Sequence, residues 1–195
     1  KKDLVTNGAW TNATNLSRAE APKLLAAAGV PNLSFTLTNR NVAMPYTPVG
    51  VFLIDQWRQI GVTVKHEQLE TRLYLAAQQR DKPTYEAALD FNCDFMDEPN
   101  LQLQKYLSHD RSPINYAQQS DRVLDELFDK QSGELDKKKR YAILREFEKR
   151  ALDQAYTVPT IWWHRIIVHH KVMKGWNITP SHYVGQDLSD VWLDQ

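Results

Sequence analysis

The chain has 195 residues with 24 basic and 24 acidic side chains, so its formal net charge at pH 7 is zero. That balance argues against a nucleic-acid or membrane-surface partner, because both attract proteins with a basic excess. The length suits one domain, or one domain with an appendage, and is sufficient for a sizeable hydrophobic core. Its one cysteine, Cys93, excludes an internal disulfide, and no apolar run reaches the roughly 18 residues that a membrane helix needs.

The first sixteen residues show little hydrophobic periodicity, which predicts a loop or linker over 1–16. The pattern from Ser17 to Glu20 is a capping box, and apolar residues follow it at helical spacing as far as Gly29. We therefore expect a helix to begin at Ser17 and the folded domain to span 17–195.

Segments typical of strands and helices alternate in the first half of the chain. Three segments are typical of strands: 33–38, 62–67 and the apolar run that begins at Tyr85. Helices are predicted between them, at about 47–60 and 71–80. This order is typical of helices that cross over a parallel sheet, with the strand ends on one edge. The predicted fold class is α/β, with a mixed, largely parallel sheet flanked by helices.

The second half is predicted to be helical first and extended later. Helices are expected after Pro99, at Ser120 and at Asp136, and extended segments at 157–163, 166–168 and 172–178. Asp125 and Asp129 are four apart on the second of these helices, a spacing that indicates a solvated face. We expect Val191 and Trp192 to pack back onto the body.

A cluster of acids follows the third predicted strand: Asp94, Asp97 and Glu98. Ligands of open α/β sheets bind outside the carboxyl ends of the strands, so a carboxylate there can hold a cation such as an ammonium group. Asp94, which is nearest the strand, is the stronger candidate. Asp97 and Glu98 are explained equally well as acids that complement the next helix. We expect this edge to gather Asn39, Leu69, Glu70 and residues 92–94.

The remaining chemistry-bearing side chains favour structural roles. Cys93 is expected to be a packed thiol, and Trp162 and Trp163 to present one indole to each face of a strand, one in the core and one at a cleft. His169 and His170 are adjacent on a predicted strand and cannot easily share one ion. The common catalytic signatures are absent from the sequence, and we expect no metal and no cofactor.

Several motifs occur in an order that is similar to a known family. They lie at 22–31, 57–64, 94–99, 115–125, 158–159 and 172–176. In this order the chain resembles, from about Ser17 to Leu193, the C-terminal lobe of family 5 extracellular solute-binding proteins. These are the periplasmic dipeptide- and oligopeptide-binding components of ABC importers.

The resemblance implies one lobe of a class II-type periplasmic binding protein, which is not an enzyme. Its partners would be a peptide or other small solute, the N-terminal lobe and a membrane permease. Asp94 matches the family aspartate that pairs with the ligand ammonium group, although the match needs a gap and Asp97 takes the role in the other register. The expected ligand-binding set comprises Phe91 (a tryptophan in most members), Asn92, Cys93, Asp94, Phe95, Asp97, Trp162 and Trp163.

Two hypotheses from other classes stay open. A hydrolase that uses Asp94 with Asp97 or Glu98 predicts an enclosed pocket and raised carboxyl pKa values. A protein-interaction module predicts a flat apolar patch away from the carboxyl ends of the strands. Within the family itself, nickel complexes and sugars are alternatives to peptide as the ligand.

Overall fold

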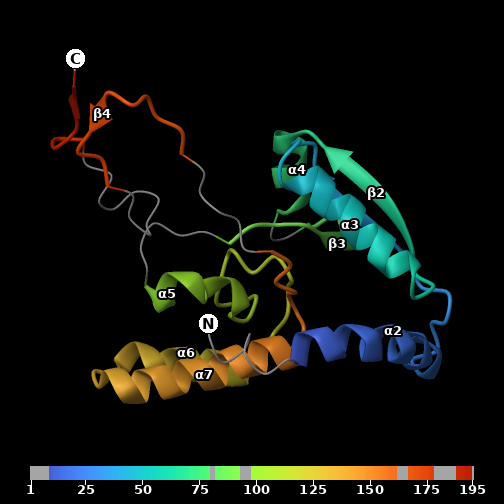
Figure 1. Cartoon of the computed structure of the whole chain (residues 1–195). Coiled ribbons are helices and arrows are strands. Elements are labelled where there is room, and N and C mark those ends of the chain that lie inside the picture. The colour runs from blue at the N-terminus through green and yellow to red at the C-terminus, as the bar shows by residue number, and fades with distance from the viewer. Residues whose placement is uncertain (1–8, 80–81, 93–97, 162–166, 178–187, 195) are drawn as a thin grey trace. The chain divides into compact units, whose positions relative to one another are not determined.

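The computed structural model describes residues 9–79, 82–92, 98–161, 167–177 and 188–194 (Figure 1). The chain divides into two compact units, Lys1–Phe91 and Asn92–Gln195. The grouping of residues 17–195 into one ligand-binding lobe stays a prediction.

The first unit contains a three-stranded sheet. Strand β1 (Ser34–Arg40) lies in the middle and pairs in parallel with β2 (Thr63–Leu69) on one side and β3 (Ala87–Ala88) on the other. The predicted parallel arrangement is therefore confirmed. The third strand is much shorter than the apolar run from Tyr85 predicts, because only Ala87 and Ala88 stand in register with β1.

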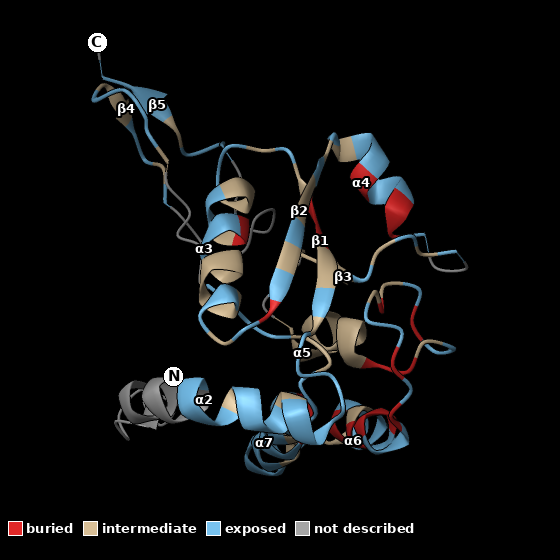
Figure 2. Ribbon diagram, turned by 90° about the vertical axis from the view of Figure 1, so that its right-hand side faces the viewer, coloured by how far each residue is buried: buried red, intermediate tan, exposed pale blue. Residues whose placement is uncertain are grey.

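Helices α3 (Tyr46–Arg58) and α4 (Thr71–Ala77) cover opposite faces of this sheet (Figure 2). Helix α3 begins at Tyr46, close to the predicted start, and Thr47 donates its hydroxyl to the carbonyl of Val42 at 3.1 Å. Trp57 of α3 packs edge-on against Phe35 of β1, with ring centroids 5.2 Å apart. Phe52, also on α3, is 61% exposed.

Helix α2 (Ala9–Ala27) precedes the sheet and begins earlier than the capping box predicts. The loop prediction is therefore wrong for residues 9–16, and Ser17 and Pro22 both lie inside the helix. Weak hydrophobic periodicity, on which the prediction depended, does not exclude a helix, because helix propensities of ordinary side chains differ by only about 0.7 kcal/mol per residue or less. Gly29 does end this helix as predicted, in the left-handed region with φ +77°.

The second unit is built on two helices that lie side by side, α6 (Arg122–Gly133) and α7 (Lys137–Gln154) (Figure 1). They follow α5 (Pro99–Gln102) and a short 3-10 helix (Gln104–Tyr106). Asp121 and Asp136 cap α6 and α7, close to the predicted starts. The core between the helices contains Leu107, Leu124, Leu127, Phe147 and Ala151.

The end of the chain is less regular than predicted. Residues 157–161 and 167–168 form no strand, because the described residues offer them no hydrogen-bonded neighbour. Strand β4 (Met173–Lys174) pairs antiparallel with β5 (Trp192–Leu193), and the Asp194 amide donates to the Val172 carbonyl at 2.8 Å. Trp192 is 55% exposed, so the prediction that it packs against the body is wrong.

Among the described helices, none is both long enough and apolar enough to cross a lipid bilayer.

Candidate functional site

The strands of the parallel sheet end on a shared edge. Arg40, the last residue of β1, stands opposite Leu69, the last residue of β2. On the other side the Leu89 amide, just after β3, donates to the carbonyl of Thr38 at 3.2 Å. The expectation that Asn39 and Leu69 meet at one edge is therefore confirmed.

The predicted ligand-binding residues fall mostly outside the described part of the chain. Phe91 is described and is 49% exposed. Asn92 is exposed, and its Nδ2 donates to the Gln102 carbonyl at 3.5 Å. The other six, which stay predictions, are Cys93, Asp94, Phe95, Asp97, Trp162 and Trp163.

Glu98 has a structural role. Its side chain caps α5 by accepting the Asn100 amide at 3.3 Å, and it forms an ion pair with Arg140. The hydrogen bond from Arg140 holds the pKa of the Glu98 carboxyl below its ordinary value. The prediction that Glu98 complements the positive end of the next helix is therefore confirmed. The hydrolase hypothesis predicts a raised carboxyl pKa, and that prediction is wrong for Glu98.

Asn39 is fully buried at the edge, and its amide orientation is fixed by the backbone. Its Nδ2 donates to the Tyr46 carbonyl at 2.7 Å, and its Oδ1 accepts the Arg40 amide at 2.8 Å. The same Nδ2 lies 3.1 Å from Nε2 of His66 on β2. Because Nδ2 can only donate, His66 Nε2 must accept and carries no proton.

The Asn39–His66 pair depends on a glycine in the helix above it. A Cβ at Gly50 of α3 would lie 2.6 Å from both Asn39 Nδ2 and His66 Nε2. Burial lowers the pKa of His66, which favours the same unprotonated ring. The sequence analysis missed His66 and Gly50, although a glycine inside a helical pattern is a signal of close approach.

Arg40 is a second edge residue that the sequence analysis missed. Its Nη1 donates to the Tyr46 hydroxyl at 3.1 Å, and its Nη2 to the Thr71 hydroxyl at 3.3 Å. The guanidinium carbon lies 4.8 Å from the centre of the Tyr46 ring, a cation–π contact. Its buried Nε has no hydrogen-bond partner among the residues that the structure describes. The signal in the sequence was a cation at the carboxyl end of a strand.

Tyr74 of α4 fixes the chain as it leaves β3. Its hydroxyl donates to the Leu89 carbonyl at 2.7 Å and accepts from Nε2 of Gln78 at 2.9 Å. Burial raises the pKa of this phenol, so it stays protonated and able to donate. The segment that leads toward Phe91 therefore has a fixed starting point at the edge.

Asp125 and Asp129 of the second unit both make contacts within that unit. Asp125, predicted on a solvated face, is only 3% exposed and accepts the Ser108 amide at 2.9 Å, so that prediction is wrong. The sequence spacing gave no sign of Ser108, which lies far away along the chain. Asp129 is exposed as predicted and pairs with Arg111 at 2.8 Å.

The histidine pair near the end of the chain also has ordinary packing. The His169 ring lies edge-on to Trp176, with centroids 5.9 Å apart, and its Nδ1 lies 3.1 Å from the His170 carbonyl. Within the described ranges, no three His, Cys, Asp or Glu side chains gather closely enough to hold a metal ion.

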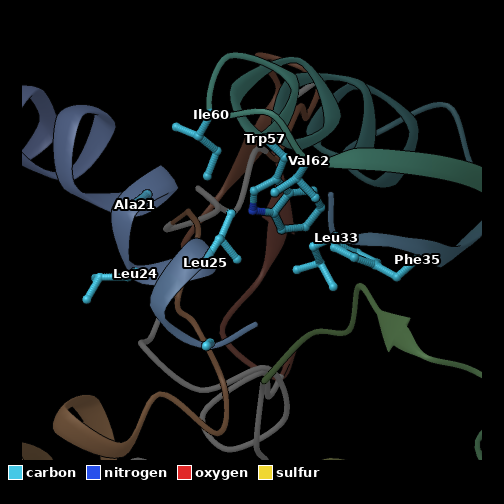
Figure 3. Close-up of a pocket in the computed structure, with 9 residues that line it drawn as sticks. Ala21, Leu24, Leu25, Leu33, Phe35, Trp57, Ile60 and Val62 are labelled. Carbon is cyan, nitrogen blue, oxygen red and sulfur yellow. The ribbon is translucent and has the colours of Figure 1, made fainter. Parts of the chain in front are cut away.

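An apolar groove of about 410 Å³ lies elsewhere in the first unit (Figure 3). It is lined by side chains of α2 and α3, of the residues just after these helices, and of the residues that precede or begin the strands: Ala21, Leu24, Leu25, Ala28, Leu33, Phe35, Trp57, Ile60 and Val62. Leu33 and Val62 precede β1 and β2, so the groove is at the amino end of the sheet. It offers no charged group to a ligand and is separate from the edge at Asn39 and Arg40.

The arrangement of the elements has close counterparts among solved structures. One is the ABC transporter-associated periplasmic binding protein DppA from Helicobacter pylori in complex with peptide STSA, with a TM-score of 0.74 and 20% identity over 91% of this chain. Another is the ABC transporter substrate-binding protein CtaP from Listeria monocytogenes, with a TM-score of 0.72 and 22% identity over 91% of this chain. The chain has the fold of part of a periplasmic binding protein.

The match covers only part of each solved structure. This chain covers 34% of the DppA structure and 37% of the CtaP structure, so it spans about a third of their length. A third similar structure is the oligopeptide-binding protein AppA from Bacillus subtilis in complex with a nonapeptide, with a TM-score of 0.66 and 15% identity. The match covers 91% of this chain and 37% of the AppA chain. The predicted fold class is thus confirmed. No protein-family model and no curated protein matches the sequence.

Proposed function

We propose that the chain is part of the substrate-binding component of an ABC importer, and that it forms one lobe of a receptor for peptides or similar small solutes. The observation that carries this proposal is the shared carboxyl edge of three parallel strands, in a chain whose fold is that of part of a peptide-binding protein. Such edges are where open α/β sheets bind their ligands.

The proposed ligand site lies where the chain continues from β3. Tyr74 holds the Leu89 carbonyl at the edge, and the next residues lead through Phe91 toward Asp94. In this proposal the Asp94 carboxylate pairs with the ammonium group of a peptide, because a shielded ammonium ion needs a fixed anionic partner. The aromatic neighbours Phe91, Phe95, Trp162 and Trp163 pack against the ligand, with Asn92, Cys93 and Asp97 beside them.

The proposed receptor acts by capture and closure and catalyses no reaction. Two lobes close over the ligand by a hinge motion, and the closed form engages a membrane permease. The matched structures are named as binding proteins, and DppA is named as periplasmic, which supports a periplasmic location for this receptor too. The ion pair between Glu98 and Arg140 also supports a binding role, because Glu98 is then not available to form a catalytic pair with Asp94.

The first test is the ligand that co-purifies with the full-length protein, identified by mass spectrometry. A peptide or other small solute retained at near-stoichiometric amounts supports the proposal. A preparation that neither retains a solute nor binds any member of a mixed peptide library contradicts it.

The second test separates the role of Asp94 from the fold. In the full-length receptor, Asp94→Asn should weaken the binding of free-amine peptides at least about tenfold, or 1.4 kcal/mol, and leave N-acetylated peptides less affected. The matched control is Asp153→Asn, which removes an exposed acid that pairs with Lys149 on α7. Equal losses for free and acetylated peptides in calorimetry would exclude Asp94 from this role.

A further inference from the structure

A chain of polar contacts runs from Asn39 through His66 toward helix α3. Asn39 Nδ2 lies 3.1 Å from Nε2 of His66, and the side-chain amide of Gln68 lies 3.3 Å from Nδ1 of the same ring. The Gln68 amide also lies 3.4 Å from the hydroxyl of Thr47, which donates to the Val42 carbonyl at 3.1 Å. Side chains of β1, β2 and α3 are therefore joined near the carboxyl edge of the sheet.

One assignment of protons gives every donor in this chain an acceptor. Because Asn39 Nδ2 donates, Nε2 of His66 accepts, and the single proton of the neutral ring is on Nδ1. The Gln68 amide must then turn its oxygen to Nδ1 and its nitrogen to the Thr47 hydroxyl. The opposite orientation would set two donors face to face and require a second hydroxyl proton from Thr47, whose one proton goes to Val42. The neutral form of His66 therefore completes the chain.

The same side chains hold the loop between β1 and α3 closed. Asn39 Nδ2 also donates to the Tyr46 carbonyl at 2.7 Å. The amide and the hydroxyl of Thr47 both donate to the Val42 carbonyl, at 3.2 and 3.1 Å. This loop, 41–45, follows the end of β1 and so borders the edge where the ligand is proposed to bind. His66 connects the two side chains that close it.

A proton on Nε2 of His66 would break the chain. The new N–H would face the Asn39 Nδ2 group, and both can only donate. Asn39 cannot turn its amide without losing the bonds to the Arg40 amide and the Tyr46 carbonyl. Neither side chain has room toward α3, since a Cβ at Gly50 would already lie 2.6 Å from both nitrogens. The structure accommodates the protonated ring only if loop 41–45 or α3 moves.

Burial, and not a neighbouring charge, governs the titration of His66. The other charged or titratable side chains of β1, α3 and β2 are Arg40, Tyr46, Asp55, Arg58, Lys65 and Glu67. Arg40 donates to the Tyr46 hydroxyl at 3.1 Å, and Asp55 pairs with Arg58. Lys65 and Glu67 point to the opposite face of β2, because successive side chains of a strand alternate. Burial lowers the pKa of His66, so the ring is neutral near pH 7 and is protonated in acid.

We propose that His66 is a pH-sensitive positioning residue, whose neutral ring keeps loop 41–45 in the form that binds ligand and whose protonation releases the loop. This inference rests on the proposed function and extends it, because it makes the capture of a solute depend on the acidity around the receptor. By linkage the effect is reciprocal. A bound peptide stabilises the neutral ring and so holds the pKa of His66 lower than in the free receptor.

The experiment uses the full-length receptor and a library of di- to pentapeptides without titratable side chains. The receptor is equilibrated with the library at pH 8, and the best-retained peptide is identified by mass spectrometry after desalting. Calorimetry then measures the affinity for that peptide from pH 8 to pH 4.5. The wild-type affinity should fall about tenfold over this range, with a midpoint below the ordinary histidine value of 6.5.

One variant and one control make the result specific to His66. A glutamine at this position can accept the Asn39 bond at every pH, so His66→Gln should lose most of the pH dependence of the wild type. The control His170→Gln removes an exposed histidine of the second unit and should keep that dependence. Titration of the peptide termini cancels, because all three receptors bind the same peptide. Thermal unfolding at each pH checks that each receptor is folded.

A second measurement needs no variant. An NMR titration of the wild-type receptor with labelled histidine follows the His66 ring with and without saturating peptide. The peptide should move the titration of His66 to lower pH. Hydrogen exchange of the segment 41–47, corrected for the intrinsic effect of pH, should quicken as the ring becomes protonated, because the Thr47 amide loses its bond to Val42.

The outcomes separate this inference from the function on which it rests. If His66→Gln keeps the wild-type pH profile, or if peptide leaves the titration of His66 unchanged, the role of His66 is overturned and the receptor function stands. If the wild type retains no peptide at any pH, the receptor function fails and the inference fails with it. A pH dependence that only His66→Gln abolishes supports both.

Discussion

The side-chain amide of Asn39 donates a hydrogen bond to Nε2 of His66, 3.1 Å away on the neighbouring parallel strand. Gly50 of α3 lies directly against this pair, since a Cβ there would be 2.6 Å from both nitrogens. A strand residue, its neighbour and a helix glycine therefore fit together as one unit. This unit joins α3 to the sheet beside the edge at which Arg40 ends β1.

The first prediction concerns the space at Gly50. Gly50→Ala should destabilise the first unit by about 1–3 kcal/mol, because the added methyl group forces Asn39 or His66 to move. Alanine favours a helix over glycine by at most about 1 kcal/mol, which does not offset the clash. The matched control is Gly133→Ala in α6, where an added Cβ meets nothing within 4 Å. Urea unfolding that showed the same change for both variants would contradict the proposed contact.

The second prediction concerns pH. Burial lowers the pKa of His66 in the folded chain below its ordinary value of 6.5. The folded state therefore binds a proton less readily than the unfolded state does, so the His66 contribution to stability is complete above pH 6.5 and is lost as the pH falls through the folded pKa. Protonation would also place an N–H on Nε2 against the Asn39 donor.

His66→Gln provides the comparison for this pH dependence. The wild-type chain should lose more unfolding free energy between pH 8 and pH 5.5 than His66→Gln does, at equal ionic strength. An NMR titration should show the His66 ring changing charge below its ordinary value of pH 6.5. A His66 pKa at or above the ordinary value would refute the acceptor role of Nε2.

The third prediction concerns Asp121, whose carboxylate caps α6 and also pairs with Arg150. One oxygen accepts the amides of Val123 and Leu124 at 3.0 and 3.3 Å, and the other accepts Nε of Arg150 at 2.8 Å. Burial raises the pKa of this carboxyl, but the hydrogen bonds and charge of Arg150 and the two amides outweigh burial, and the net shift is downward.

Asp121→Ala should therefore cost about 2–4 kcal/mol, from a lost helix cap and a lost partly buried ion pair. Asp121→Asn keeps an oxygen for the cap and should cost less. Asp129→Ala removes only an exposed pair with Arg111 and should cost under about 1 kcal/mol. Comparable losses for Asp121→Ala and Asp129→Ala in urea unfolding would show that the buried network contributes little.

Local signals predicted much of the fold. The period-two alternation from Leu33 identified β1, and the polar residues before apolar helical spacing identified the starts of α6 and α7. Glycine marked the end of α2. These features depend on neighbours in the sequence, which is why a single sequence reveals them.

The errors and omissions concern contacts between distant residues. Asp125 was assigned to a solvated face, because its spacing from Asp129 says nothing of the Ser108 amide that it accepts. The role of His66 depends on the space beside Gly50. The role of Arg40 depends on its hydrogen bonds to Tyr46 and Thr71. Only the fold brings these residues together. Strand pairing also depends on distant residues. Residues 157–161 have the composition of a strand, but among the described residues no strand pairs with them.

The last prediction concerns affinity of the chain by itself. If the proposed function is right, these 195 residues supply one lobe, and the ligand stays open to solvent on the side that the other lobe would cover. The ligand would then make about half of its contacts while paying the full loss of translational and rotational freedom, so calorimetry should detect weak binding or none. The full-length receptor should bind the same peptide at least about a hundredfold more tightly, a difference of roughly 2.8 kcal/mol. Equal affinity for the two proteins would mean that this chain encloses its ligand alone, and the two-lobed receptor would have to be abandoned.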